Sequence, residues 1–201
     1  TPVASQIEMI QKLVPDAKTV GVFYTSSETN SKLQADMAIE AGEKLGYTME
    51  TYTVSQSSEI QQVVESMVGK IDALYIPTDN LLASNMPTVS MVANQAKIPT
   101  ICGESGMVEN GGLITNGINY FDLGVLTGKQ AAEILEGADP ATMPIEYCQE
   151  DSYTYTVNED TAAEIGIEIP EEFLQDSEEV ETEASTETAE ETETESESAA
   201  E

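Results

Sequence analysis

Apolar positions along this sequence follow two alternating patterns as far as residue 137. The first is a short, nearly continuous apolar run, as at residues 20–24 and 73–76, which is typical of a strand buried on both faces of a sheet. The second places Leu33, Met37 and Ala41 four residues apart, which is typical of an amphipathic helix. Along the chain, these patterns predict strands at 20–24, 48–54, 73–76, 98–101 and from 113, and helices at 3–14, 33–45, 60–68, 86–96 and 123–135.

Strands that alternate with helices through short loops predict an α/β domain, in which a parallel sheet is flanked by helices. Parallel neighbours need right-handed crossovers, so the helices are expected on both faces of the sheet. The pattern changes after Pro144, where residues 145–149 and 153–157 are two strand-like runs with no helix between them. A short helix near 158–165 follows, and the ordered part is expected to end near Leu174.

The charge of the chain is strongly negative and is concentrated at its carboxyl end. The sequence carries 38 Asp and Glu against seven Lys and Arg, which gives a formal charge of −31 at pH 7. Such a charge repels phosphates, so it excludes nucleic acid as a partner and disfavours an anionic lipid surface. Residues 175–201 hold 12 of the acidic residues, no basic ones, and otherwise mostly Thr, Ser and Ala. We therefore predict a disordered acidic tail, which serves either as a solvated spacer or as an acidic interaction segment.

Several residue types that catalysis or metal binding commonly uses are missing. The chain has no His, no Arg and no Trp, which removes a Ser-His-Asp triad, an imidazole metal ligand and a guanidinium fork for phosphate. No glycine motif for a nucleotide follows a strand, so we predict no metal, no cofactor and no enzymatic activity. An α/β enzyme that uses Asp79 and Glu104 for acid–base work is the alternative. Cys102 and Cys148 lack metal-ligand spacing and are predicted as two buried free thiols in preference to a disulfide.

Polar residues follow the predicted strands at their carboxyl ends, which is where open parallel sheets bind ligands. Residues 26–31 lead into a helix, whose free N–H groups and dipole favour a carboxylate, and Asp79 can accept hydrogen bonds from an ammonium group. The aromatic faces of Tyr24 and Tyr120 suit an apolar or aromatic side chain. Each residue also has an ordinary explanation, as a helix cap, a turn, a solvated charge or core packing. Because these loops share one edge of the sheet, we predict a site for a small zwitterion. Its predicted residues are Ser26, Asn30, Ser31, Thr78, Asp79, Asn80, Glu104 and Tyr120.

Five segments of the sequence resemble one protein family. They are the run 18–24, the loop Glu28-x-Asn30-Ser31, the segment 72–80 with Pro77-Thr78-Asp79-Asn80, the stretch 107–113 with Gly111-Gly112-Leu113, and the segment 117–131 with Tyr120-x-x-Leu123-Gly124 and Thr127-Gly128. The family is that of the ABC-transporter substrate-binding proteins related to the tryptophan and tyrosine uptake lipoproteins. The resemblance spans nearly all of residues 1–174. It implies a type I periplasmic-binding-protein fold, in which two α/β lobes close around a ligand.

The resemblance also implies how the chain is divided. Residues 1–119 would form the second lobe, and an entire first lobe is expected before Thr1. Residues 120–174 would form a return segment that packs toward the first lobe, together with closing strands, and residues 175–201 the tail. The return helix would then leave apolar residues exposed or repacked in this chain. These residues are Leu123, Leu126, Ala131 and Leu135.

The function that the resemblance implies is the capture of a solute for an ABC importer. The ligand would be an amino acid, aromatic in its side chain, and the protein partner an ABC permease. The full-length protein would be extracytoplasmic, at the surface of a Gram-positive bacterium or in the periplasm, and anchored by a lipid. Asp79 would meet the ammonium group and the side chains of Ser26, Asn30 and Ser31 the carboxylate. The residues that would orient or cover the ligand are Thr78, Asn80 and Tyr120. A ligand-sensing receptor domain and a site for a sugar or nucleoside are the alternatives.

Overall fold

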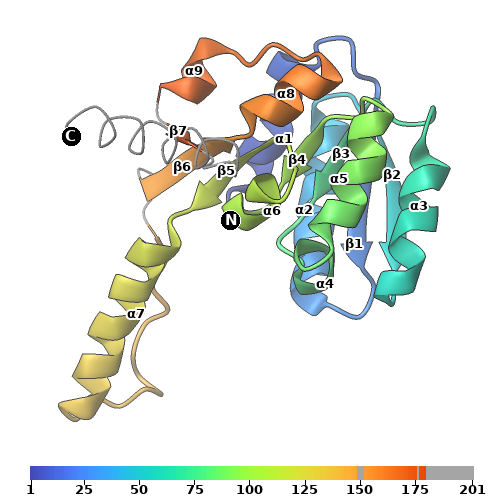
Figure 1. The fold of residues 1–201 in the computed structure, drawn as a ribbon. Coiled ribbons are helices and arrows are strands. Elements are labelled where there is room, and N and C mark those ends of the chain that lie inside the picture. Colours follow the sequence, from blue (N-terminus) through green and yellow to red (C-terminus); the bar gives the residue numbers. More distant parts are fainter. Residues whose placement is uncertain (149–151, 176, 180–201) are drawn as a thin grey trace, which may run out of the picture.

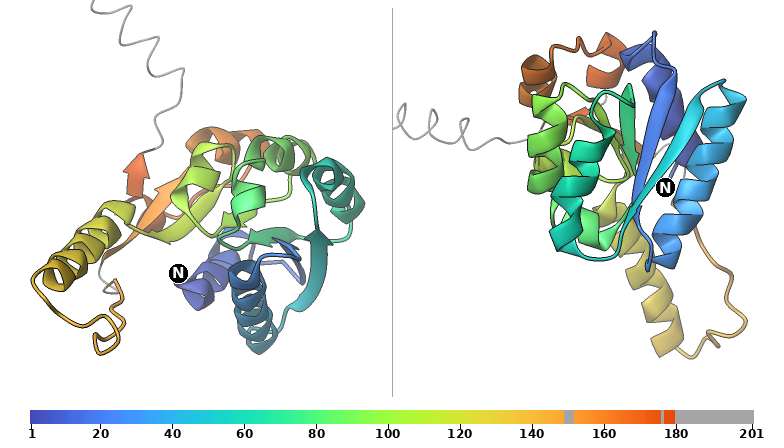
Figure 2. Two further views of the ribbon diagram at one scale, coloured as in Figure 1. Left: turned by 90° about the horizontal axis from the view of Figure 1, so that it is seen from below. Right: turned by 90° about the vertical axis from the view of Figure 1, so that its right-hand side faces the viewer.

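The structure is a computed structural model of the chain that describes residues 1–148, 152–175 and 177–179 (Figure 1). A sheet with helices on both faces makes up most of it, as Figure 2 shows from two further directions. The helix α7 (Tyr120–Leu135) projects away from these layers (Figure 1). None of the helices in the described ranges combines the length and the apolar character needed to cross a bilayer.

The strands within the described residues form one sheet. They are β1 (Thr19–Thr25), β2 (Thr48–Val54), β3 (Ala73–Ile76), β4 (Thr100–Cys102), β5 (Ile114–Ile118), β6 (Tyr153–Val157) and β7 (Ser177–Glu179). Their order is β2-β1-β3-β4-β5-β6-β7, and the first five are parallel, as the alternation of strands and helices predicts. Because β1 pairs with both β2 and β3, the direction of strand succession reverses at β1 and β3. This reversal is the switch point at which open α/β sheets bind ligands.

Helices cover both faces of this sheet. The remaining elements are α1 (Val3–Leu13), α2 (Thr29–Lys44), a short 3-10 helix (Ser57–Glu59), α3 (Ile60–Met67), α4 (Asn80–Ala83), α5 (Met86–Gln95), α6 (Ser105–Glu109), α8 (Glu159–Ile165) and α9 (Glu171–Leu174). One apolar core contains side chains of α1 and α2 together with Val22 of β1, and the other contains side chains of α3 to α6 together with Phe23. Neighbouring strand residues point to opposite faces, which is why the apolar run of β1 is continuous.

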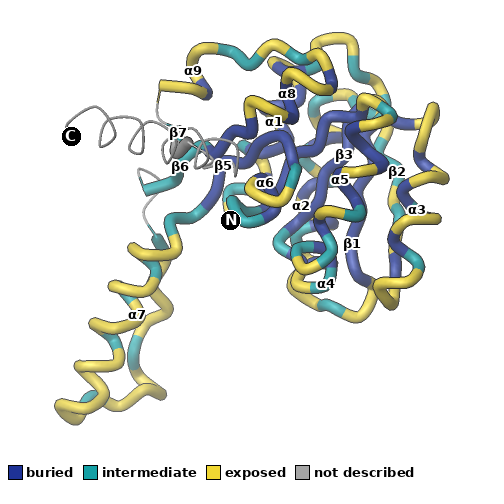
Figure 3. The backbone as a smooth tube through the Cα atoms, viewed as in Figure 1, coloured by how far each residue is buried: buried dark blue, intermediate teal, exposed yellow. Residues whose placement is uncertain are grey.

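The projecting helix α7 contributes no buried residue to either core. Figure 3 shows it exposed along its length, in contrast to the buried strands. Leu135 is 89% exposed, Ala131 is exposed, and Leu123 and Leu126 are partly exposed. Of the two predicted outcomes for this apolar face, exposure or repacking, the structure shows exposure at Ala131 and Leu135 and partial exposure at Leu123 and Leu126.

The segment that precedes β6 differs from the sequence prediction. The strand-like run 145–149 is not a strand at residues 145–148, where Ile145 is 80% and Tyr147 is 75% exposed, and residue 149 lies outside the described residues. The edge of β5 to which such a strand would add is already paired with β6 in antiparallel register. Both cysteines are free, but only Cys102 is buried, whereas Cys148 in this segment is partly exposed.

The start of the acidic tail also differs from the expectation of disorder. Residues Ser177–Glu179 form β7, which pairs in parallel with β6. Strand pairing uses backbone hydrogen bonds, so a polar sequence can add to an exposed sheet edge without apolar side chains. The predicted disorder over residues 180–201 concerns residues outside the described ranges.

A buried polar cluster joins α1 to the sheet. The Gln6 side chain is fully buried, accepts a hydrogen bond from the Tyr75 hydroxyl at 2.9 Å, and donates from Nε2 to the carbonyl oxygen of Asn116 at 2.8 Å. The same Nε2 lies 3.4 Å from the carbonyl oxygen of Gly103 and from Thr115 Oγ1. Because a buried polar group without a partner is costly, these bonds fix α1 in one position over β3, β4 and β5.

We expect Tyr75→Phe to lower the free energy of unfolding by about 1–3 kcal/mol, because it leaves the buried Gln6 Oε1 without its donor. Urea denaturation measures this change. Tyr47→Phe is the control, since Tyr47 is partly buried and its hydroxyl bonds to no other described residue. The control should change the free energy by less than about 0.5 kcal/mol. Equal losses in both variants would contradict the importance of the Gln6 cluster.

Candidate functional site

Two loops meet at the switch point between β1 and β3. Asn30 and Ser31, in the first turn of α2, both reach the loop that follows β3. Asn30 Nδ2 donates to the carbonyl oxygen of Thr78 over 3.1 Å, and Ser31 Oγ donates to the same oxygen over 3.2 Å. Gln34, one helical turn further along α2, accepts from the Thr78 N–H over 3.0 Å. The backbone of Thr78 is therefore fixed by three side chains of one helix.

Asp79 is a buried carboxylate at the same junction and is only 1% exposed. Its Oδ2 accepts from the Thr25 N–H at 2.7 Å, and its Oδ1 accepts from Thr25 Oγ1 at 2.8 Å and from the Leu82 N–H at 2.9 Å. Asp79 thus ties the end of β1 to the start of α4, where it is the N-cap. That Asp79 also receives an ammonium group stays a prediction.

Glu28 binds the amino end of α4 from the opposite loop. Its carboxylate accepts from Asn80 Nδ2 at 2.7 Å, from the Asn80 N–H at 3.1 Å and from the Leu81 N–H at 3.1 Å. Burial alone would raise the pKa of Glu28, but the hydrogen bonds from Asn80 and Leu81 outweigh it and lower the pKa below its ordinary value. The predicted site residue Asn80 is therefore held by Glu28.

Glu104 and Tyr120 form a pair beyond the ends of β4 and β5. The Tyr120 hydroxyl donates to Glu104 Oε2 at 3.0 Å. Burial, followed by the charge of Glu104, raises the pKa of Tyr120 to about 12, so the hydroxyl keeps its proton at neutral pH. Thr78 Oγ1 donates to the carbonyl oxygen of Gly103 at 3.4 Å and so links this pair to the switch-point loops.

Seven of the eight predicted site residues are thus joined by hydrogen bonds or by adjacency in the chain. Ser26 follows Thr25, which bonds to Asp79, but the Ser26 side chain itself turns to β2, where its Oγ donates to the carbonyl oxygen of Val54 at 3.1 Å, so we leave it out of the group. We call the other seven the edge cluster. They are Asn30, Ser31, Thr78, Asp79, Asn80, Glu104 and Tyr120.

Sequence reasoning missed three residues that hold the edge cluster in place. Gln34 follows Asn30 by four positions, so the two share a face of α2. Glu28 belongs to a motif that carried the family resemblance, but no position-specific signal marked its contact with α4. Gln6 lies four positions before Ile10 on the apolar face of α1, and a polar residue in such a stripe is a signal for a buried hydrogen-bonding role.

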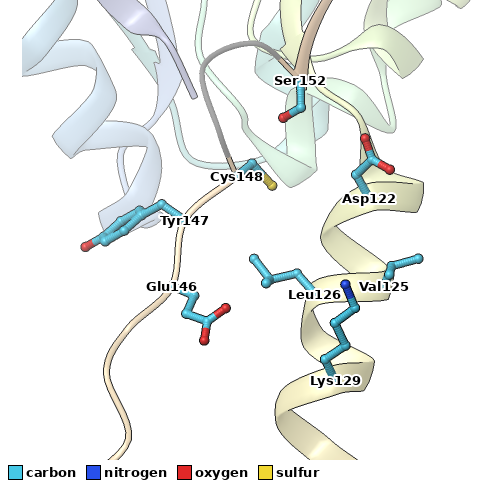
Figure 4. A pocket seen from close by; sticks show the side chains of 8 residues that line it. All are labelled: Asp122, Val125, Leu126, Lys129, Glu146, Tyr147, Cys148 and Ser152. Carbon is cyan, nitrogen blue, oxygen red and sulfur yellow. The ribbon is translucent and has the colours of Figure 1, made fainter.

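A groove of about 600 Å³ runs between α7 and the segment that follows it (Figure 4). Leu126 and Val125 give it an apolar side, and Lys129 and Glu146 add charges of both signs. None of the predicted site residues lines it. Among the described residues, no group of three or more Cys, Asp or Glu is arranged to hold a metal ion.

We expect Glu28→Gln to lower the free energy of unfolding at pH 7 by about 1–2 kcal/mol, because a neutral amide cannot accept on both of its arms. The folded-state pKa of Glu28 is lowered, so its contribution is present in full above the ordinary pKa of 4.5 and is lost as the pH falls through the folded-state value. The difference between variant and wild type should therefore narrow in acid. Urea denaturation between pH 7 and pH 3 measures it, with the exposed Glu43→Gln as control. A difference in the free energy of unfolding that stays constant with pH would contradict this role of the Glu28 carboxylate.

We expect Gly103→Ala to destabilise the fold by about 1–3 kcal/mol and to displace the Thr78 loop. A Cβ on Gly103 would come closer than 3.0 Å to the backbone nitrogen of Thr78 and the carbonyl carbon of Pro77. Gly124→Ala in α7 is the matched control, since nothing lies within 4 Å of its Cβ position. It should be neutral or stabilising by up to about 1 kcal/mol. Thermal and urea unfolding measure both variants, and similar effects at the two glycines would rule out the crowding argument.

Comparison with known proteins shows which family this chain resembles. A family model described as ABC transporter substrate binding protein matches residues 1–181. The tyrosine-binding protein of Clostridioides difficile (strain R20291) is 44% identical over 155 residues, which are 77% of this chain and 44% of that protein.

Two solved structures extend the comparison to the fold. An ABC domain from Streptococcus pneumonia in complex with L-Trp superposes with a TM-score of 0.82 at 39% identity, covering 89% of this chain and 60% of that chain. The ligand-free, open form of a substrate-binding protein with adhesive properties from Clostridium difficile has a TM-score of 0.73 at 42% identity, covering 91% of this chain and 61% of the other.

The chain spans less than two thirds of the length of each of these relatives. The superpositions confirm the predicted periplasmic-binding-like α/β fold, and the relatives are binding proteins. With the family match over nearly the whole of the described chain, this protein belongs to the ABC transporter substrate-binding protein family.

Proposed function

We propose that this chain forms one wall of an interlobe cleft in an extracytoplasmic, lipid-anchored binding protein, which captures an aromatic amino acid and delivers it to an ABC permease. The ligand class is supported by two relatives, one named for binding tyrosine and one solved with L-Trp. The mechanism is capture by closure of two lobes, followed by presentation to the permease, with no covalent step.

The observation that carries the proposal is the position of the edge cluster. It lies at the carboxyl ends of β1, β3, β4 and β5, and its densest contacts, from Asn30 and Ser31 to Thr78, fall at the switch point of the sheet. Ligands of open α/β sheets bind in the crevice at this place, because the loops on its two sides diverge there. A cluster on another edge would not have this access.

The first turn of α2 suits the carboxylate of an amino acid. The N–H groups of Thr29, Asn30 and Ser31 bond to no acceptor among the described residues. α2 is 16 residues long, so its amino end carries the partial positive charge that stabilises an anion. Asn30 is exposed and adds an amide side chain at the same place. We therefore assign carboxylate binding to this turn.

The aromatic side chain of the ligand is proposed to lie toward α7. Tyr120 is 50% and Phe121 is 78% exposed at the start of this helix, next to the Glu104 pair. Exposed aromatic rings are suited to cover a flat apolar group. Because α7 buries none of its residues, its exposed apolar face supports α7 as the part of the return segment that packs toward another lobe. The closing strand β6 instead pairs with β5, and Val157 and Phe173 share a core with α1, so this part of residues 120–174 belongs with residues 1–119.

Isothermal titration of the protein carrying both lobes tests the ligand class. We expect heat with L-Trp, L-Tyr and L-Phe in the micromolar range, about −8 kcal/mol, and little with L-Leu. Asn30→Ala should weaken the best ligand about tenfold, since it removes one hydrogen-bonding group from the carboxylate end. Asn110→Ala is the control, because Asn110 is also exposed and its side chain bonds, among the described residues, only to the carbonyl oxygen of Gly106. Heat with a sugar or nucleoside and none with any amino acid would refute the proposal.

A further inference from the structure

Three carboxylates follow three neighbouring parallel strands at the edge cluster. Glu28 comes after β1, Asp79 after β3 and Glu104 after β4. An amino acid bound at this edge brings an ammonium group, which needs an anionic or carbonyl acceptor. The hydrogen bonds that each carboxylate already accepts decide which of the three is available as an acceptor for the ammonium group.

Two of the three carboxylates are occupied by the protein itself. Glu28 accepts from both donors of Asn80 and from the backbone of Leu81, and so uses both of its oxygens. Asp79 also uses both oxygens and is 1% exposed. An ammonium group could reach Asp79 only by opening the loops that bury it, and on Glu28 it would compete with the donors at the amino end of α4.

Glu104 is different in each respect. It is partly exposed, and its only hydrogen bond to a described residue is the one that Oε2 accepts from the Tyr120 hydroxyl. Although Glu104 is the N-cap residue of α6, its side chain makes no capping bond. Its Oε1 therefore keeps its lone pairs, while the Tyr120 bond fixes the orientation of the carboxylate.

The position of Glu104 also fits the rest of the edge cluster. Its neighbour Gly103 accepts from Thr78 Oγ1, and Thr78 is the residue to which Asn30 and Ser31 bond. The chain of contacts thus runs from the first turn of α2, which offers N–H donors, to Glu104, which offers an acceptor. In an α-amino acid the ammonium and carboxylate groups are attached to the same carbon. Its binding site therefore needs an acceptor and N–H donors near one another.

We propose that Glu104, rather than Asp79, is the residue that binds the ammonium group of the ligand, an inference that rests on the proposed function as an amino-acid-binding protein. Tyr120 is the partner that holds the Glu104 carboxylate in place. The Asp79 carboxylate instead serves the fold, by tying β1 to α4.

Titration with paired ligands tests this assignment in the protein carrying both lobes. The probes are L-Trp and L-Tyr, each compared with the analogue that lacks the amino group, indolepropionate or hydroxyphenylpropionate. Glu104→Gln should weaken the amino acid about 10- to 100-fold and leave the affinity for its deaminated analogue unchanged or higher. Glu109→Gln, which removes the same charge from an exposed position of α6, should alter neither affinity.

Asp79→Asn separates the two assignments. We expect it to lower the melting temperature and to weaken amino acid and analogue to the same extent. A loss in Asp79→Asn that is selective for the ammonium group, or a loss in Glu104→Gln that is equal for both ligands or absent, would overturn the proposal while wild-type binding upholds the proposed function. Wild-type protein that binds no amino acid would overturn both.

Discussion

The parallel arrangement of the first five strands places every residue of the edge cluster at one side of the molecule. Strands joined by right-handed crossovers all end at the same edge, and the loops after them are neighbours however far apart they are in the sequence. Asn30 and Thr78 are separated by 48 positions yet share a hydrogen bond. The close approach of Gly103 to the Thr78 backbone allows the loop after β4 to join them. The cluster exists because of this constraint on the sheet.

The polar groups at this edge divide into those that the fold uses and those that remain available. Glu28 and Asp79 bond to backbone and side-chain donors of the loops that they join, which rigidifies the wall of the crevice. The amino end of α2 and the Glu104 carboxylate keep unused hydrogen-bonding capacity. A binding surface needs both kinds of group, because a ligand gains affinity from acceptors and donors that are already held in position.

The layered part of the structure and the helix α7 meet different physical conditions. The sheet and its helices bury two apolar cores, and a buried polar cluster centred on Gln6 fixes α1 over the strands. The helix α7 buries nothing and leaves Leu135 and Phe121 in solvent. The groove beside α7 has a lining of apolar and charged side chains.

Most of the fold follows from the pattern of apolar residues. The continuous run at 20–24 and the four-residue spacing from Leu33 correspond to β1 and α2, since burial on two faces and on one face leave different periodicities. Residues 145–148 show where this fails, because a strand also needs a free edge, and β5 pairs with β6 instead. The backbone pairing that forms β7 leaves no apolar signal in the sequence.

The sequence by itself determined the α/β class, the parallel sheet and the loops in which the edge cluster lies, because each depends on local periodicity or on a rule of strand connection. Only the tertiary structure decided how the carboxylates of those loops are used. In the sequence, Asp79 and Glu104 look alike, because each is a carboxylate side chain that follows a strand. Burial and three donors occupy one, while partial exposure and a single tyrosine leave the other an unused oxygen, and such differences arise from contacts between segments far apart along the chain.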